Sequence, residues 1–305
     1  MIESVAAVSF LFTAIRLSTP LTFAALGGYC SERSGTVNIA LEGMMLTGAF
    51  AAAVVAHATH SALSGVCAGV AGAMLMALLH GFLCITLKSD QIISGMAINL
   101  LALGIPPVVS KALYDMSGGT PLLQASERVQ PVFAISPLAL GAFVATALLF
   151  LVHSRTRVGQ YLRFAGEHPE ALQSQGVNVR SIRWLGVLAA GALCGLGGAY
   201  LSIDHGGAFA RNMTAGRGFI ALAALIIGRW TPLGALAASL VFGAVEATQI
   251  LLQGTSFPNG ADGQTVPVQW IQMLPYIATL VILAGVGGSR YRNRTRAPRS
   301  LGQPF

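Results

Sequence analysis

A few charged and polar side chains lie inside long apolar runs of this 305-residue sequence, where each needs a chemical reason. The ionisable ones are Arg16, Glu42 and Glu246, and the amide and hydroxyl side chains are Asn38, Asn99, Thr248 and Gln249. An ionised group inside hydrocarbon costs about 2.5–3.5 kcal/mol or more, so such residues pair with one another or line a polar path. The predicted path residues are Asn38, Glu42, Asn99 and Glu246. The alternative for Arg16 and Glu246 is a structural partner or a charged head that reaches the membrane surface.

Other chemistry-bearing residues lack the neighbours that catalysis or cofactor binding requires. His57 and His60 share a helix face, but no third metal ligand is evident near them, so we predict no metal site. His80 and His153 have no matched carboxylate or serine motif. The glycine-lysine sequence of an ATP-binding phosphate loop is absent, so we expect this chain to bind no ATP itself. These patterns predict neither an enzyme nor a cofactor-binding chain.

The composition indicates which elements hold these residues. Hydrophobic residues make up 54% of the chain and charged residues 10%, against about 25% charged in a soluble domain. A membrane-spanning helix needs about 20 apolar residues. The candidate spans are 5–29, 36–57, 61–87, 90–113, 132–153, 184–203, 217–229, 232–252 and 268–288. The segment 217–229 is short for a crossing and is predicted to be a half-helix or to extend into its flanks.

We therefore predict an all-α, polytopic integral membrane bundle of about eight to ten transmembrane helices, at least one of them broken. Residues 1–305 form one transmembrane domain with a cytoplasmic loop at 154–183 and a basic cytoplasmic tail at 289–305. The first lysine or arginine is Arg16, so we expect the N-terminal run to be the first span and not a cleaved signal peptide. The 36 glycines favour close helix packing.

The net charge of +7 predicts membrane orientation and not nucleic-acid binding. Nine crossings with the tail inside place thirteen basic residues on the cytoplasmic side, among them Arg33, Lys88 and five arginines of 154–183. Four basic residues then fall outside, namely Lys111, Arg128, Arg211 and Arg217. This bias follows the positive-inside rule and puts the N-terminus outside. The basic tail is suited to anionic lipid head groups.

The stretch Gly27–Gly48 does not suit a plain lipid-facing helix. It holds five glycines, with Asn38 and Glu42 four residues apart on one helical face. A broken helix, with its freed backbone facing protein or a water-filled path, is the favoured interpretation. The alternative is a tight inside turn in which Glu42 caps or pairs locally.

The loop 154–183 contains signals for a very short helix at 169–175. His168 or Glu167 can cap it, Pro169 suits the first helical position, and Glu170 lies favourably near the positive helix end. Gly176 can supply the left-handed stop. A helix of about seven residues is marginal alone, so docking into another structure is favoured over an ordinary cytoplasmic loop.

These two stretches resemble a known transporter family. Glu170-Ala171-Leu172 followed by Gly176 is similar to the EAA-x-x-x-G loop of ABC importer permeases, although Leu172 replaces the second alanine. The segment SERSGTVNIALEGMM resembles that of bacterial nucleoside ABC permeases within the branched-chain amino-acid, sugar and nucleoside group, as does GRGFIALAA at 216–224. The resemblance implies coupling to an ATPase through Gly166, Glu167, Pro169, Glu170, Ala171, Leu172 and Gly176.

The resemblance also implies partners and a location. They are an ATPase subunit with two nucleotide-binding domains that carries the ATP and Mg²⁺, a second related permease, and an extracytoplasmic substrate-binding lipoprotein. The implied location is the bacterial plasma membrane, and the implied substrate is a nucleoside that meets hydrogen-bonding side chains along the path. A simple sugar remains an alternative substrate. An ion-coupled secondary transporter using Glu42 or Glu246 is a different class, which uptake without any ATPase would reveal.

Overall fold

The computed structural model describes residues 2–131, 135–254, 273–286 and 297–303, and the regular elements within these ranges are helices. The seven long apolar ones are α1 (Ile2–Arg33), α2 (Leu41–Thr59), α3 (Ala62–Gly81, continued by the π-helical turn Phe82–Thr86), α4 (Gln91–Tyr114), α5 (Pro137–Arg155), α8 (Val179–Ala199, continued by the π-helical turn Tyr200–Gly206) and α10 (Pro232–Gly254). Shorter helices are η2 (Ala125–Glu127), α6 (Arg157–Glu167), α7 (Pro169–Ser174), α9 (Arg217–Ile227) and α12 (Leu274–Val286).

The prediction of a helical membrane bundle is confirmed. Seven described helices are long and apolar enough to cross a membrane. Helix α9 has 11 residues, and at 1.5 Å per residue it is about half as long as the hydrocarbon layer is thick. The predicted half-helix is therefore present, and α12 lies where the last span was predicted.

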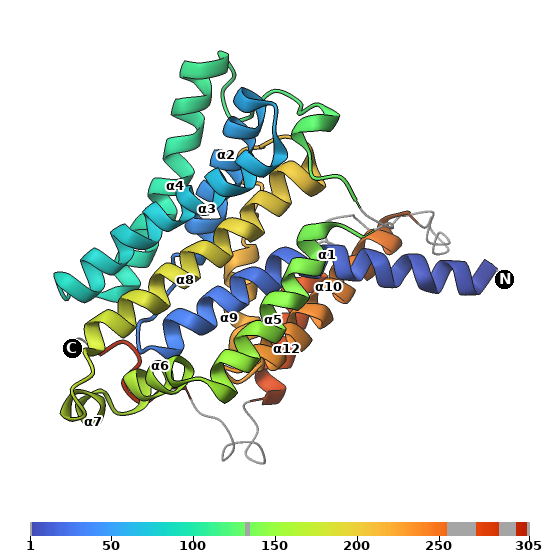
Figure 1. Cartoon of the computed structure of the whole chain (residues 1–305). Helices are drawn as coiled ribbons and strands as arrows, with labels where there is room; N and C mark the ends of the chain where they lie inside the picture. The colour runs from blue at the N-terminus through green and yellow to red at the C-terminus, as the bar shows by residue number, and fades with distance from the viewer. Residues whose placement is uncertain (1, 132–134, 255–272, 287–296, 304–305) are drawn as a thin grey trace.

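The bundle has two opposite ends (Figure 1). We call the end that carries Arg33, α6 and α7 the inner end, and the C-terminal segment 297–303 lies there too. We call the opposite end, formed by the loop residues 115–131 and 207–215, the outer end. These two loops pair with each other: the Thr120 N–H donates to the Phe209 carbonyl oxygen at 3.1 Å, and the Leu123 N–H donates to the Gly207 oxygen at 2.9 Å. The predicted separation of 154–183 from the loops 114–131 and 204–216 is confirmed, whereas the third predicted outside loop, 253–267, lies almost entirely outside the described residues.

Helix α8 lies at the centre of the bundle because its glycines admit three neighbours. It packs extensively against α1, α2 and α3. A Cβ added at Gly195 would lie 2.6 Å from the Val70 Cα of α3, and one at Gly198 would collide with the Met45 carbonyl oxygen of α2. The predicted use of glycine for close helix packing is therefore confirmed.

We expect Gly198→Ala to destabilise the bundle. The added methyl group has no room between α8 and α2, and overpacking of this kind typically costs about 1–3 kcal/mol. The midpoint of thermal unfolding in detergent should fall. Gly104→Ala is the matched control, since no atom lies within 4 Å of a Cβ added at Gly104. A Gly198→Ala protein as stable as the control would contradict this packing.

Candidate functional site

Helix α7 confirms the short helix predicted in the polar loop. Pro169 occupies its first turn, and Gly176 follows it with φ +77°, a conformation that glycine adopts without strain. The helix is anchored by Leu172, which is 5% exposed and packs with Ala165 and Val179. His168 precedes the helix but makes no side-chain capping bond, so a capping role for its side chain was wrong.

The remaining face of α7 is available at the inner end. Glu170 and Ala171 are exposed, as are the other polar side chains of the helix. A cleft of about 390 Å³ lies along its first turn. Its lining residues are Glu167, His168, Pro169, Glu170, Ala171, Arg299, Ser300 and Gln303.

The end of α6 contacts residues 33–35 at the end of α1, so the loop 154–183 and the stretch Gly27–Gly48 meet. The Arg33 guanidinium and the Glu167 carboxylate form an ion pair at 3.5 Å. A Cβ added at Gly166 would collide with the Arg33 carbonyl oxygen, and one added at Gly35 would lie 3.3 Å from the Ala165 oxygen. The α6–α7 junction therefore packs directly against the turn between α1 and α2.

The stretch predicted to be either a broken helix or an inside turn is an irregular connection, which we call the break, between the separate helices α1 and α2, and distant side chains satisfy its backbone. Residues 34–40 are not part of any α-helix. The Val37 N–H donates to Gln91 Oε1 at 2.7 Å, and the Val37 carbonyl oxygen lies 3.0 Å from His80 Nε2. His80 Nδ1 in turn lies 3.1 Å from Ser94 Oγ. Side chains of α3 and α4 therefore stabilise the break. Sequence reasoning missed His80, Gln91 and Ser94 because the backbone group to which they connect lies far from them in the chain.

Two of the predicted path residues belong to this break. Asn99 Oδ1 accepts from the Gly43 N–H at 2.8 Å, and Asn99 Nδ2 donates to the Ile39 oxygen at 3.0 Å. Asn38 is fully buried beside Met44. It precedes α2, so the expected helix face shared by Asn38 and Glu42 was wrong.

Glu42 caps the half-helix α9 from a distance of 174 residues. Its Oε1 accepts from the Gly216 N–H at 2.8 Å, and its Oε2 accepts from the Gly218 N–H at 2.6 Å. A carboxylate at a helix N-terminus satisfies donors that have no partner within the helix and faces the positive end of the helix dipole. Gly218 permits the approach, because a Cβ there would lie 2.5 Å from the Glu42 nitrogen. Local capping, the alternative drawn from sequence, is not what the structure shows.

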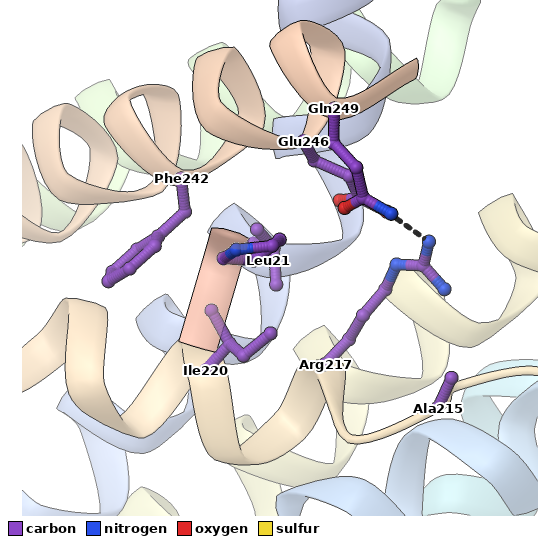
Figure 2. A pocket seen from close by; sticks show the side chains of 8 residues that line it. Leu21, Ala215, Arg217, Ile220, Phe242, Glu246 and Gln249 are labelled. Atoms are coloured by element: carbon purple, nitrogen blue, oxygen red, sulfur yellow. Dashed lines mark hydrogen bonds and ion pairs between the residues drawn. The ribbon is translucent and has the colours of Figure 1, made fainter. Parts of the chain in front are cut away.

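The first turn of α9 also carries one side of a polar cavity (Figure 2). Arg217 Nη2 lies 2.5 Å from Glu246 Oε1 of α10, and both side chains are about one-fifth exposed. The cavity measures about 290 Å³. Its lining residues are Leu21, Ala215, Arg217, Ile220, Phe242, Glu246, Gln249 and Pro275. The sequence predicted Arg217 as the first residue of a span and counted it on the outer side; the structure shows that it begins α9 and pairs with Glu246.

Of the four predicted path residues, Glu246 alone lines this cavity. Glu42 reaches it indirectly through α9, while Asn38 and Asn99 lie at the break. The only sequence signal for the Arg217–Glu246 pair is that each is an isolated charge of opposite sign beside an apolar run.

The other end of α9 is tied to α1. Trp230 Nε1 donates to Glu32 Oε2 at 2.6 Å, and Leu225 of α9 packs on Tyr29 and Cys30. The half-helix is thus attached at both ends to the segment that contains the break.

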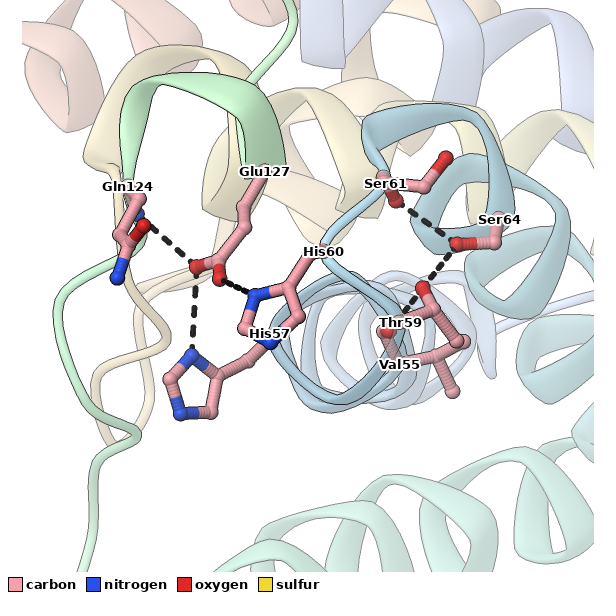
Figure 3. A network of polar contacts seen from close by, with 8 residues as sticks. All are labelled: Val55, His57, Thr59, His60, Ser61, Ser64, Gln124 and Glu127. Carbon is pink, nitrogen blue, oxygen red and sulfur yellow. Dashed lines mark hydrogen bonds and ion pairs between the residues drawn. The ribbon is translucent and has the colours of Figure 1, made fainter.

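The outer end contains a buried carboxylate that sequence reasoning missed. Glu127 Oε1 lies 2.6 Å from His60 Nδ1, and Glu127 Oε2 lies 3.3 Å from His57 Nδ1 and accepts from the Gln124 N–H at 2.9 Å (Figure 3). Desolvation raises the pKa of Glu127, but the hydrogen bonds from Gln124, His60 and His57 outweigh it, so the net shift is downward. The two histidines therefore join the α2–α3 turn to the outer loop through one ionised carboxylate.

Seven helices long and apolar enough to span a membrane indicate a multi-pass membrane protein. The chain belongs to the family described as the permease component of the branched-chain amino acid transport system, whose model matches residues 10–284.

Several similar proteins carry the names of ABC transporter permeases. Guanosine ABC transporter permease protein NupQ of Bacillus subtilis is 36% identical, covering 94% of this chain and 93% of NupQ. Nucleoside ABC transporter permease protein NupC of Lactococcus lactis is 35% identical, with 88% of each chain covered. A Haloferax volcanii permease named for glucose transport, TsgC13, is 31% identical over 91% of each chain. The resemblance to nucleoside ABC permeases drawn from the sequence is confirmed.

One solved structure shares the fold. It is described as a metal-chelate type ABC transporter in an inward-facing conformation, with TM-score 0.51 and 15% identity over 90% of this chain and 85% of that chain. At this identity the likeness concerns the fold alone.

Proposed function

We propose that this chain is a permease subunit of an ATP-driven nucleoside importer in the bacterial plasma membrane. The observation that carries the proposal is α7, an exposed short helix whose base contacts the break between α1 and α2. The names of the relatives NupQ and NupC support a nucleoside as the substrate. The name of TsgC13 makes a simple sugar the second candidate.

The proposed partners follow from the transporter class. A cytoplasmic ATPase with two nucleotide-binding domains holds ATP and Mg²⁺ and receives α7. A second related permease completes the membrane unit, and an extracytoplasmic lipoprotein delivers the substrate.

A continuous set of contacts supports a route from the ATPase to the cavity. Closure of the ATPase would displace α7, and the contacts of Gly166 and Glu167 with residues 33–35 would pass the displacement to the break. Glu42 lies just after the break and holds the first turn of α9, which carries Arg217 into the cavity. Coupling through packed elements with two arrangements is the physical basis of such switching.

The cavity beside α9 is the proposed substrate-binding site on the transport path. It offers a guanidinium, a carboxylate, an amide and the aromatic ring of Phe242. Such groups suit a solute that has both hydroxyl groups and a flat ring. Hydrogen bonds of this kind contribute about 0.5–1.5 kcal/mol each.

We expect Gln249→Leu to lower the maximal rate of guanosine uptake about threefold to tenfold, the kinetic equivalent of one lost hydrogen bond. Uptake by the reconstituted complex, with saturating binding lipoprotein, is the measurement. Thr248→Val is the matched control, because Thr248 is exposed, does not line the cavity and bonds only to its own helix. Equal uptake rates in the two variants would show that Gln249 does not contribute to the transport path.

The function itself is tested by reconstituting the complex in liposomes. Labelled guanosine and labelled glucose are offered separately, with and without internal ATP. We expect ATP-dependent accumulation of guanosine and little of glucose. Accumulation of glucose alone would assign the sugar function, and accumulation of either solute without the ATPase subunit would overturn the proposal in favour of ion coupling.

A further inference from the structure

The C-terminal segment returns to the inner end and binds the coupling loop. Ser300 is 4% exposed, and both its N–H and its hydroxyl donate to the Gly166 carbonyl oxygen, at 2.8 and 2.7 Å. Pro298 is buried, and a Cβ added at Gly166 would lie 3.0 Å from the Pro298 Cβ. The segment is therefore attached at the point where α6 ends and α7 begins.

The same segment also reaches the break and α8. The Gly302 N–H donates to the Gly35 oxygen at 3.1 Å. The buried Arg183 of α8 donates from Nη1 to the Gln303 oxygen at 2.7 Å. Six residues of tail thus join three elements through hydrogen bonds whose acceptors are all main-chain oxygens.

Arg299 differs from its neighbours in the tail because its side chain is exposed. It lies across the cleft from the first turn of α7 and faces the same opening as Glu167 and Glu170. One wall of the cleft therefore belongs to the loop and carries the Glu167 and Glu170 carboxylates, while the other belongs to the tail and carries the Arg299 guanidinium.

We propose that residues 298–303 form the second wall of the ATPase-docking surface, so that the ATPase contacts the tail and α7 together. This inference rests on the proposed function. A partner that enters the cleft beside the first turn of α7 meets Arg299 there, because both line that cleft. The tail also makes α7, the break and the start of α8 one connected unit beneath that partner.

The test measures the affinity of the purified ATPase subunit for the full permease complex in detergent. Arg299→Glu reverses the charge of the second wall without touching a buried group, and we expect it to raise Kd at least about tenfold, as charge reversal at a docked surface does. A chain that ends after Ala297 should bind at least as weakly. Arg211→Glu makes the same charge change at an exposed outer-end residue and should leave Kd unchanged.

Glu170→Arg distinguishes a failure of the tail inference from a failure of the proposed function. If it weakens ATPase binding while both tail variants bind within twofold of the unmodified protein, the tail is not part of the docking surface and the proposed function stands. If Glu170→Arg also leaves binding intact, the proposed function fails as well. Should the shortened chain unfold at a lower temperature, Arg299→Glu decides alone, since it keeps every main-chain hydrogen bond of the tail.

Discussion

Glu42→Ala is expected to reduce uptake at least tenfold and to lower the thermal stability of the bundle. Glu42 is 7% exposed, and its two oxygens accept the N–H groups of Gly216 and Gly218. Removing the carboxylate leaves the buried Gly218 N–H unpaired, at a cost of about 1–3 kcal/mol, and also the part-buried Gly216 N–H. The first turn of α9 then loses its only described acceptor from α2, and Arg217 loses its fixed position in the cavity.

Three variants separate the carboxylate's geometry from its charge. Glu42→Gln keeps one acceptor oxygen and should retain more uptake than Glu42→Ala. Gly218→Ala attacks the same contact from α9, because its Cβ would lie 2.5 Å from the Glu42 nitrogen, and it should reproduce the loss. Gly104→Ala should not. Unimpaired uptake by both Glu42→Ala and Gly218→Ala would show that α9 needs no cap to function.

Glu170→Arg in α7 should uncouple uptake from ATP hydrolysis without unfolding the spans. The side chain is exposed and makes no described contact that holds α7 in place, so the folded bundle has no reason to change. In the docked complex, reversing the charge of a contact residue costs about 2–5 kcal/mol, which is more than a tenfold loss of coupled uptake.

Gly176→Pro tests the geometry of α7 in place of its charge. Proline fixes φ near −65°, whereas Gly176 has φ +77°, so the chain cannot leave α7 in the same direction. Substrate-stimulated ATPase activity and uptake in liposomes are measured together. Asp115→Arg is the control for charge, because its side chain is 90% exposed at the outer end. Normal coupling in both α7 variants would exclude this helix as the contact with the ATPase.

The features that the sequence predicted well depend on local chemistry. The proline, the glycine and the acidic first turn of 169–176 lie within eight residues, and they suffice to place α7. The length of an apolar run similarly predicts whether a helix crosses the membrane, which is why the half-helix at 217–227 was identifiable. The glycine density around 27–48 is likewise a local signal, and it predicted the irregular segment between α1 and α2.

The features that the sequence did not predict depend on pairs of residues far apart. Glu42 meets α9, Trp230 meets Glu32, and Glu127 meets two histidines of α2 and its C-terminal turn. A lone polar residue in an apolar run shows that a partner exists but not which residue it is. The sequence predicted one helix face for Asn38 and Glu42, because it does not show that His80 of α3 and Gln91 of α4 hydrogen-bond to the backbone of the break.

The close fit of α8 against α2 and α3 limits where the protein can change shape. Backbones that touch at Gly195 and Gly198 cannot slide past each other without collision, so these three helices are expected to move as a rigid block. The half-helix α9 also packs closely on its neighbours, but its two ends are held by hydrogen bonds, from its first turn to Glu42 and from the following Trp230 to Glu32, and such bonds can be exchanged one at a time. In the proposed transport cycle we therefore expect the glycine-packed centre to stay fixed and α9, a segment of eleven residues, to move.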